Sequence, residues 1–225
     1  MAIAPTVALL DVNETLSDFN RLGERFEEVG APAQLMPTWF AATLRDGMAL
    51  TASGEYAAFG DVARAVLRGL LSDHPRLYRP PEEAVEHVLA GIGTLPVQGD
   101  VPDGIRLLRE AGMCVATLTN GAPAIAHGLL ERAGLGDMVE RNIGVEEVGR
   151  WKPAPEPYRH ACRSLGVEEA HAILIAAHPW DVHGAKRAGL RAGWVNRRGQ
   201  PYPEVFAPPD VSAGDLPALA RGLAG

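Results

Sequence analysis

The chain has 225 residues, of which 47% are hydrophobic and 22% charged, and its formal net charge is -7. This composition is that of an ordinary globular protein, and the length allows one large domain or a core domain with a smaller insertion. The excess of acidic residues argues against nucleic acid as a partner, because no basic surplus is present to neutralise phosphates.

The cysteines and the apolar segments narrow the class of protein further. Cys114 and Cys162 are too few for a disulfide framework or a metal cluster, and the apolar neighbours of Cys114 favour a small buried side chain. The N-terminal apolar run has no basic region before it and stops at Asp11, which is typical of a strand and not of a signal peptide. No apolar stretch is long enough to cross a bilayer. We therefore expect a cytoplasmic protein that does not bind membranes.

The first predicted element is a strand that ends on an acid. Val7 to Leu10 are apolar without a polar break, and Asp11 follows directly in the stretch LLDVNETLSD. A short apolar run bounded by polar residues predicts a strand that is buried on both faces of a parallel sheet. Asp11 is then either the N-cap of a following helix or a reactive group at the mouth of the sheet. This segment alone favours the cap slightly.

The next segment, from Leu16 to about Leu95, shows helical periodicity and little strand pattern. Its apolar residues recur at helical spacing in three groups, namely Phe19, Leu22 and Phe26; Trp39, Phe40 and Leu44; and Val62, Val66, Leu67 and Leu70. An all-helical block inserted directly after the first strand predicts a cap above the sheet. We therefore divide the chain into a core of residues 1–15 and 96–225 and a helical cap of residues 16–95.

From residue 97 onward, predicted strands alternate with predicted helices. The strands cover residues 113–118, 142–145, 172–176 and 193–196, and the helices cover 101–111, 123–133, 156–165 and 182–188. In the second of these helices, Ile125, Leu129 and Leu130 are expected to face inward. A Pro-rich loop over 201–209 precedes a final short helix. This alternation predicts an α/β fold with a doubly wound parallel sheet, in which ligands bind at the carboxyl ends of the strands.

Polar side chains follow several of the predicted strands. They are Asp11, Asn13 and Thr15; Thr119, Asn120 and Gly121; Lys152 and Tyr158; and His178, Trp180 and Asp181. A single Asp after a strand is usually a cap, and a single Lys before Pro is usually solvated. Four such polar groups at successive strand ends would seldom occur by chance. An ammonium such as Lys152 would lower the pKa of Asp11 and orient it as a nucleophile. The amides of Asn120 and Gly121 could hold developing negative charge.

The order of these motifs resembles the haloacid dehalogenase superfamily over nearly the whole chain. The motifs are Asp-x-x-x-Thr from Asp11, Thr-Asn-Gly from Thr119, Lys-Pro from Lys152, and an apolar strand followed by Asp181. Within the superfamily, the segments KPAPEPY and WDVHGAKRAG, the latter followed by WVNRRG, look most like the L-2-haloacid dehalogenases. The resemblance implies a Rossmann-like core with an inserted helical cap, a small-molecule substrate and a homodimer.

Most members of the superfamily are Mg²⁺-dependent phosphatases, and two positions argue against that activity here. Phosphatases that resemble this chain have a second Asp, which acts as general acid, at the position of Asn13. They have a metal-binding acid at the position of Ala177. Mg²⁺ requires oxygen ligands in near-octahedral geometry, so a missing ligand weakens the site. A weak phosphatase therefore ranks below a dehalogenase, which needs neither a metal nor another cofactor because halide leaves without protonation.

The resemblance to the dehalogenases implies a role for each matching residue. Asp11 would displace halide from C2 of a short 2-haloacid, and water would then hydrolyse the aspartyl ester to release the 2-hydroxyacid. Lys152 and Asp181 would hold the nucleophile, and Asp181 would help to position the water. The other matches are Thr15, Thr119, Asn120 and Tyr158, with Phe59 and Trp180 at apolar positions where simple packing is an equal alternative.

Several positions depart from the pattern of the L-2-haloacid dehalogenases. Phe40 replaces an Arg that contacts the substrate carboxylate or the halide; Arg45 could substitute for it, although a solvated or salt-bridged Arg is the default. Asn13 replaces an aromatic residue, and Ala176 and His178 replace a Ser and an Asn. His178 is either a general base for ester hydrolysis or a structural hydrogen-bonding residue, and the sequence favours neither.

The missing Arg leaves two further functions open. The same nucleophile could act on another small electrophilic acid, or the fold could bind a ligand without turnover. Retention of the nucleophile and its cation argues against binding alone, which needs neither. The candidate catalytic residues are Asp11, Thr15, Lys152, His178 and Asp181; the candidate substrate-binding residues are Asn13, Phe40, Arg45, Phe59, Thr119, Asn120, Tyr158 and Trp180; no metal ligand is expected.

Overall fold

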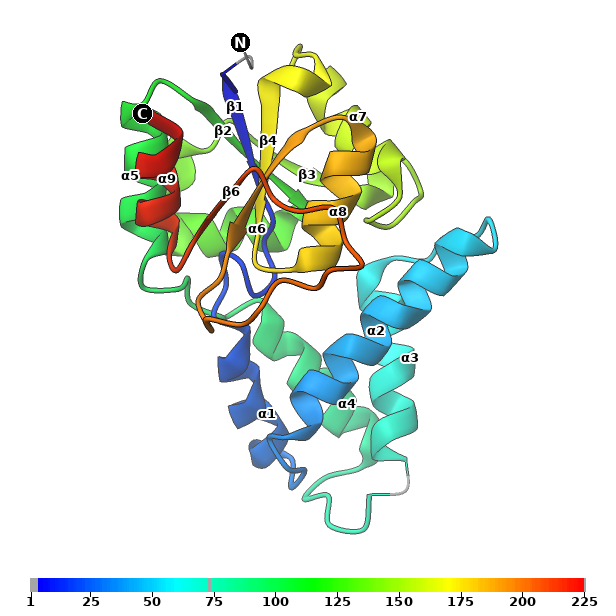
Figure 1. The fold of residues 1–225 in the computed structure, drawn as a ribbon. Helices are drawn as coiled ribbons and strands as arrows, with labels where there is room; N and C mark the ends of the chain where they lie inside the picture. The colour runs from blue at the N-terminus through cyan, green and yellow to red at the C-terminus, as the bar shows by residue number, and fades with distance from the viewer. Residues whose placement is uncertain (1–3, 73, 225) are drawn as a thin grey trace.

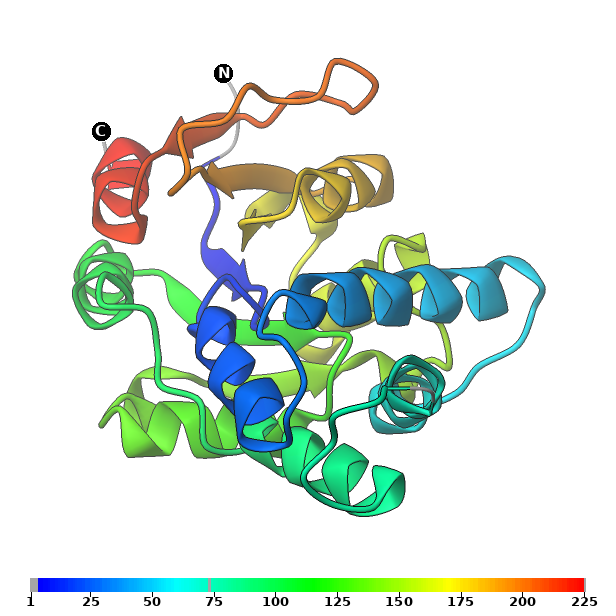
Figure 2. The ribbon, with the colours of Figure 1, turned by 90° about the horizontal axis from the view of Figure 1, so that it is seen from below.

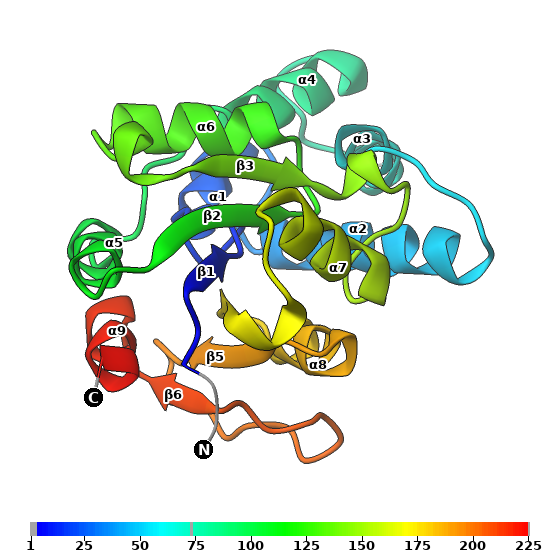
Figure 3. The same ribbon diagram turned by 90° about the horizontal axis from the view of Figure 1, so that it is seen from above.

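The centre of the molecule is a parallel sheet. The structure, a computed structural model, describes residues 4–72 and 74–224. The sheet has six strands in the order β3-β2-β1-β4-β5-β6, and all neighbours are parallel (Figure 1, Figure 3). The strands are β1 Val7–Leu10, β2 Cys114–Thr119, β3 Arg141–Gly144, β4 Ala172–Ala176, β5 Arg191–Val195 and β6 Val211–Ala213. The doubly wound α/β fold is confirmed, and its strand order reverses at β1, where ligands are expected to bind.

Helices cover both faces of this sheet, and alternate residues of β1 contribute to both cores. Ala8 and Leu10 pack with α5, α6 and α9 on one face, whereas Val7 and Leu9 pack with α7 and α8 on the other. These helices are α5 Val101–Glu110, α6 Pro123–Arg132, α7 Pro155–Ser164, α8 Pro179–Ala188 and α9 Leu216–Ala224. Burial on both faces is the reason that β1 is apolar at every position.

A second group of helices lies beyond the carboxyl ends of the strands (Figure 1, Figure 2). We call it the helical unit; it contains α1 Leu22–Glu28, α2 Leu35–Ala52, α3 Phe59–Leu71 and α4 Pro81–Ile92. It has an apolar core of its own that includes Phe26, Trp39 and Leu67. The chain enters and leaves the unit side by side, because Ser17 and Val97 form an antiparallel bridge. The exact domain boundaries expected after residues 15 and 95 stay predictions.

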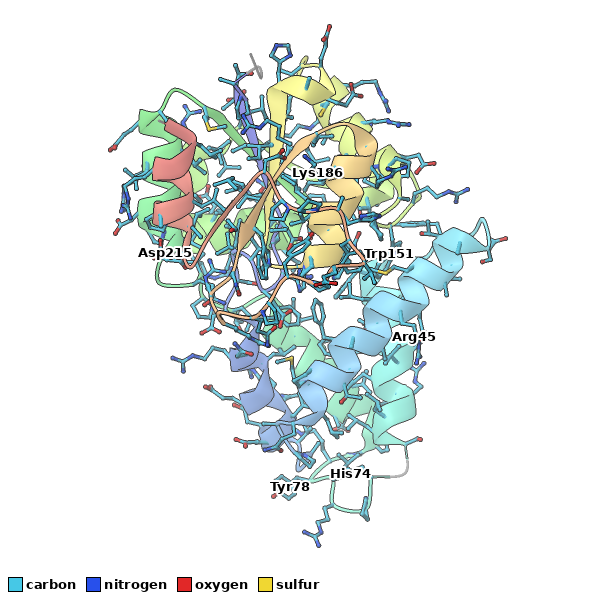
Figure 4. The ribbon with its side chains drawn as sticks, viewed as in Figure 1. Arg45, His74, Tyr78, Trp151, Lys186 and Asp215 are labelled. Atoms are coloured by element: carbon cyan, nitrogen blue, oxygen red, sulfur yellow. The ribbon has the colours of Figure 1, made fainter. Side chains whose placement is uncertain are left out.

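Trp151 joins the helical unit to the core. Its indole N–H donates to the carbonyl of Ala57 at 2.9 Å, and its backbone N–H donates to Thr51 Oγ1 at 2.9 Å. Its ring lies so close to Gly47 of α2 that a Cβ at position 47 would be 2.4 Å from it. Figure 4 shows Trp151 where α2 meets the core. Because Lys152 is the next residue, this anchor also fixes the position of the buried lysine.

The structure corrects three details of the predicted elements. Ile125 is 36% exposed because it borders a cavity between α6 and the helical unit, and Ala126 faces inward in its place, with Leu129 and Leu130. The edge strand β6 was not predicted, since three residues are too few to show a periodic pattern. α8 begins at Pro179, earlier than expected, because proline is favoured in the first turn of a helix. Among the described residues, no helix is both long and apolar enough to cross a membrane.

Candidate active site

The carboxylate of Asp11 lies directly beyond the carboxyl end of β1. Its backbone N–H donates to the carbonyl of Ile175 at 3.0 Å, so the sheet fixes its position. The Thr15 hydroxyl donates to Asp11 Oδ2 at 2.6 Å and accepts the backbone N–H of Ala177 at 2.9 Å. The interpretation of Asp11 as a helix cap is wrong, because residues 13–16 form turns and the next helical element begins at Phe19. The Asp-x-x-x-Thr spacing instead ties the carboxylate to the end of β4.

Lys152 is fully buried and connects two carboxylates. Its ammonium donates to Asp11 Oδ1 at 2.8 Å, to Asp181 Oδ2 at 2.6 Å and to the carbonyl of Leu118 at 2.9 Å. An ammonium has three N–H donors, and all three are used here. Asn120 holds the backbone on which Lys152 stands, because its Oδ1 accepts the Lys152 N–H at 2.8 Å. Asn120 therefore positions the lysine and does not face an open site.

Asp181 and Tyr158 form the inner side of this cluster. Both side chains are fully buried, and the Tyr158 hydroxyl donates to Asp181 Oδ1 at 2.5 Å. Lys152 and Tyr158 thus engage both oxygens of the Asp181 carboxylate. Tyr158, which was expected to bind substrate, contacts Asp181, and its part in substrate binding stays a prediction.

For Asp11 and Lys152, burial and neighbouring charges shift the pKa in opposite directions. Burial by itself would raise the pKa of Asp11, but Lys152 and His178 outweigh it and hold this pKa below its usual range. Burial likewise opposes the charge on Lys152, and the two carboxylates nevertheless raise the pKa of its ammonium. Burial, together with the nearby Asp11 charge, raises the pKa of Asp181. These shifts favour the ionised form of Asp11 more strongly than that of Asp181.

Glu14 belongs to the site and was not among the residues predicted for it. Its carboxylate lies 2.7 Å from His178 Nε2, and its backbone is in the left-handed region with φ 60°. The other ring nitrogen, His178 Nδ1, lies 3.5 Å from Asp11 Oδ2 and is buried without a hydrogen-bond partner in the described part of the chain. A left-handed conformation costs a non-glycine residue energy and is often found at functional sites. This conformation places Glu14 on the ring edge of His178 that faces away from Asp11.

The charge of His178 follows from these two neighbours. Burial of the ring would lower its pKa, but the Asp11 and Glu14 carboxylates outweigh burial and raise the pKa to about 9. The imidazole is therefore a cation in the free protein at neutral pH. A second positive charge thus stands beside Asp11, opposite the side that faces Lys152.

Protein stability should depend on pH through this histidine. The His178 pKa is raised from its ordinary 6.5 to about 9, so its stabilising effect is complete below about pH 6.5 and is lost as the pH rises through about 9. We expect the free energy of unfolding, measured in urea, to fall over this window, and to fall less in His178→Asn. His160→Asn, which changes a partly exposed histidine beside Glu147, is the matched control and should keep the wild-type profile. If the free energy of unfolding fell equally steeply with pH in His178→Asn, His178 would not be the source of the pH dependence.

Aromatic rings close the site on the side of the helical unit. Phe40 is 5% exposed, and its ring centroid lies 6.1 Å from that of His178 and 6.5 Å from that of Phe59. Trp180 stacks against His178 with ring centroids 5.3 Å apart, and its ring also lies 6.0 Å from the Lys152 ammonium. Phe40, Phe59 and Trp180 are thus brought together around the charged cluster, where they limit access of water.

Two of the expected substrate-binding residues, Asn13 and Thr119, lie beside the charged cluster, whereas a third, Arg45, lies away from it. Asn13 and Thr119 line a cavity of about 180 Å³ beside Asp11. Thr119 Oγ1 accepts the N–H of Gly121 at 2.9 Å, which leaves its hydroxyl proton free for another partner. Arg45 lies on the outer flank of α2, is 72% exposed and pairs with Asp46 at 2.7 Å (Figure 4). Of the two interpretations of Arg45, the default of a solvated, salt-bridged side chain agrees with the structure, and replacement of the missing Arg does not, because the side chain points to solvent.

The donor set around Asp11 does not suit a divalent cation. Within residues 4–72 and 74–224, no group of three or more His, Cys, Asp and Glu side chains is arranged to hold a metal ion. The oxygens of Asp11 accept from Lys152 and Thr15, and those of Asp181 accept from Lys152 and Tyr158. Mg²⁺ needs several free oxygen ligands in octahedral geometry, and this cluster does not offer them.

A buried, ionised carboxylate at the switch point of a parallel sheet, held by a buried ammonium, is the arrangement of an α/β enzyme. The chain belongs to the haloacid dehalogenase-like hydrolases, because the profile of that family matches residues 6–189.

Individual relatives agree with this family. The chain is 30% identical to haloacetate dehalogenase H-2 of Moraxella sp. (strain B) over 125 residues, a match that spans only about half of either protein, 56% of each. It is 26% identical to (S)-2-haloacid dehalogenase 1 of Pseudomonas sp. (strain CBS-3), over 96% of this chain and 92% of that protein. The structure of L-2-haloacid dehalogenase from Xanthobacter autotrophicus superposes with a TM-score of 0.89 at 24% identity, covering 98% of this chain and 99% of that one. This last likeness establishes a shared fold.

Proposed function

We propose that the protein hydrolyses short 2-haloacids to 2-hydroxyacids. The observation that carries this proposal is the ionised Asp11, which lies 2.8 Å from the Lys152 ammonium at the end of the central strand. A carboxylate oxygen of Asp11 attacks C2 of the acid, a C–O bond forms, and the carbon–halogen bond breaks. Halide leaves with the bonding electrons, so no proton is required. The relatives named as haloacetate dehalogenase and (S)-2-haloacid dehalogenase favour this reaction over the alternatives.

The second half of the reaction needs a base, and we assign this role to His178 with Glu14. Formation of the ester removes the charge of Asp11, which is one of the two carboxylates that raise the His178 pKa. The ring then loses a proton more easily, keeps Nε2–H on Glu14, and presents the unpartnered Nδ1 to a water molecule. Water attacks the ester carbonyl and gives one proton to His178. The acyl C–O bond then breaks, and the departing oxygen takes the second proton of that water, so that the 2-hydroxyacid leaves and the Asp11 carboxylate is regenerated.

Charge that develops on the ester carbonyl needs stabilisation, and the groups that hold Asp11 supply it. Lys152 donates to Oδ1 and Thr15 donates to Oδ2, so the oxygen that becomes negative already has a donor whichever oxygen attacked C2. Tyr158 and Asp181 hold the ammonium in place. Thr119 offers its free hydroxyl proton to the substrate carboxylate.

The helical unit serves as a cap in this proposal. Phe40 and Phe59 cover the site from above and exclude bulk water, which strengthens the interactions of the buried charges. The imidazolium of His178 provides the positive charge that an Arg in place of Phe40 would have supplied. It lies 3.5 Å from Asp11, close enough to attract a departing halide or the substrate carboxylate.

Other activities rank lower. Hydrolysis of another small electrophilic acid would use the same nucleophile and remains the second candidate, because Phe40 alters the surroundings of the substrate. A phosphatase is disfavoured, since Asn13 is no general acid and the donor set does not suit Mg²⁺. The homodimer and the cytoplasmic location remain predictions of the sequence.

Halide release in the presence of a chelator tests the function directly. We expect chloride or bromide to appear from chloroacetate, bromoacetate or one enantiomer of 2-chloropropionate, at the same rate with and without the chelator. Comparison of the two chloropropionate enantiomers gives the stereochemistry. An activity that disappears with the chelator and returns with Mg²⁺, or phosphate release without halide release, would refute the proposal.

A further inference from the structure

A cavity of about 360 Å³ borders the Glu14–His178 pair. Glu14 and His178 line it together with Trp194, near the end of β5, and with Arg197 on the loop that follows. This loop covers residues 196–210 and runs beside α8 before it reaches β6 (Figure 1). The pair is therefore in reach of the segment after β5 as well as of Asp11.

Arg197 contacts the backbone of Glu14. Its Nη1 donates to the carbonyl of Glu14 at 3.4 Å, while its Nε and Nη2 donate to the carboxylate of Asp100 at 2.9 to 3.2 Å. Asp100 is itself fixed, because its Oδ2 accepts the N–H of Leu216 at 2.8 Å. A bidentate pair of this kind holds the guanidinium in one geometry. The guanidinium is thus anchored beside the one non-glycine residue of positive φ among the described residues, Glu14 at 60°.

Trp194 contacts the backbone directly before His178. Its indole N–H donates to the carbonyl of Ala177 at 3.0 Å, and the N–H of Ala177 donates to Thr15 Oγ1 at 2.9 Å. Both polar groups of this peptide unit are therefore held. Tyr202 fixes the indole in turn, because the two rings meet edge to face with centroids 5.0 Å apart.

We propose that Arg197 and Trp194 are positioning residues for the hydrolytic half of the reaction. Arg197 holds Glu14 and Trp194 holds His178, so that the ring stays between the Glu14 and Asp11 carboxylates. The inference rests on the proposed function, in which His178 with Glu14 is the base. Both side chains act on the backbone of the base, and a displacement of a catalytic group by about 1 Å can lower a rate about 10²-fold.

The His178 pKa in the free protein tests this assignment without any substrate. The charged side chains that contact the ring, within the described part of the chain, are those of Asp11 and Glu14. Loss of the Arg197 charge by itself would raise the pKa of a nearby imidazole, whereas release of the Glu14 carboxylate from the ring lowers it. The sign of the change in Arg197→Gln therefore separates positioning from a simple effect of charge.

We expect the acid dissociation constant of His178 to rise by roughly tenfold or more in Arg197→Gln and in Trp194→Phe, so that its pKa falls below the wild-type value of about 9. The measurement is an NMR titration of the imidazole signals, in which His178→Asn identifies the signal of His178. Trp194→Phe keeps an aromatic ring beside Tyr202 and carries the test if Arg197→Gln does not fold, as judged by its unfolding midpoint in urea.

Turnover should fall roughly 10-fold to 100-fold in either variant. One halide per active site should still be released rapidly, because attack on carbon needs no base. The matched control is Arg68→Gln, which breaks a bidentate pair with Glu82, at 2.6 and 2.7 Å, on the helical unit. This control should keep the wild-type His178 pKa and the wild-type turnover.

The two readouts separate the possible failures. A His178 pKa that stays unchanged or rises in a folded variant would exclude the substituted residue as a positioning residue, whatever happens to turnover. A lower pKa with unchanged turnover would leave the positioning role standing and would refute His178 as the base. If the wild type released no halide, the proposed function would fail, and the pKa would still decide the roles of Arg197 and Trp194.

Discussion

Halide release should fall by roughly 10⁴-fold or more when Asp11 is replaced by Asn, because a neutral amide cannot displace halide from carbon. Asn has the same size, its amide oxygen can still accept from Lys152, and its NH2 group can donate to the Thr15 hydroxyl oxygen, so the fold should remain intact. The measurement is halide release at saturating 2-chloropropionate, with the unfolding midpoint in urea as a check on folding. Asp11→Ala should give the same loss of turnover.

The matched control for this substitution is Asp103→Asn. Asp103 lies on α5, is 74% exposed and pairs with Arg106. Its variant should keep wild-type turnover. Undiminished halide release in Asp11→Asn or Asp11→Ala would exclude Asp11 as the nucleophile and would show that the carboxylate serves only to hold Lys152.

The second large effect should appear in the hydrolytic half of the reaction. Without Glu14 or the His178 ring, water at the ester is not deprotonated, and steady-state turnover should fall by about 10²–10⁴-fold. Halide release should then occur as a single burst of one halide per active site, because the first half needs no base. Intact-mass spectrometry should show the acid attached to the protein through Asp11 in Glu14→Gln, and also in His178→Ala.

Two variants distinguish this role from a purely structural one. Glu14→Gln keeps the ring and the hydrogen-bonding shape of the side chain but removes its charge, so it should lower the His178 pKa and still accumulate the ester. His160→Asn, at a partly exposed histidine, should show neither a burst nor an adduct. Loss of the burst together with turnover in Glu14→Gln, which keeps the His178 ring, would refute the assignment of His178 with Glu14 as the base.

Much of the site could be predicted because it lies at strand ends. An apolar run that is buried on both faces marks β1 clearly, so the residue after it, Asp11, falls at the edge of the sheet without further information. Lys152 and Asp181 follow the same logic, and the structure brings all three within hydrogen-bonding distance. The predicted sheet and most helices agree with the structure for the same reason.

The residues that were missed depend on geometry that a sequence does not display. Glu14 reaches His178 across 164 residues of chain, from a backbone that adopts a positive φ. Arg45 was considered on its spacing from Phe40 along α2, but that spacing does not reveal which flank of the helix faces the site. Ile125 has the periodicity of a core residue, and it is exposed because the facing surface, that of the helical unit, leaves a cavity there.

The position of β1 in the middle of the sheet has a consequence for how the protein tolerates local opening. Both neighbours of β1, the strands β2 and β4, pair with it along its whole length, as in the register of Leu10 with Thr117 and Ile175. Amide hydrogens in such a strand exchange with solvent mainly through global unfolding, whereas helices attached through one pair of connections can open at lower free energy. We therefore expect Asp11 to be anchored next to the segment whose amides exchange last. Transient opening of α1–α4 would leave the pairing of β1 intact, and activity lost in this way should return when those helices close again.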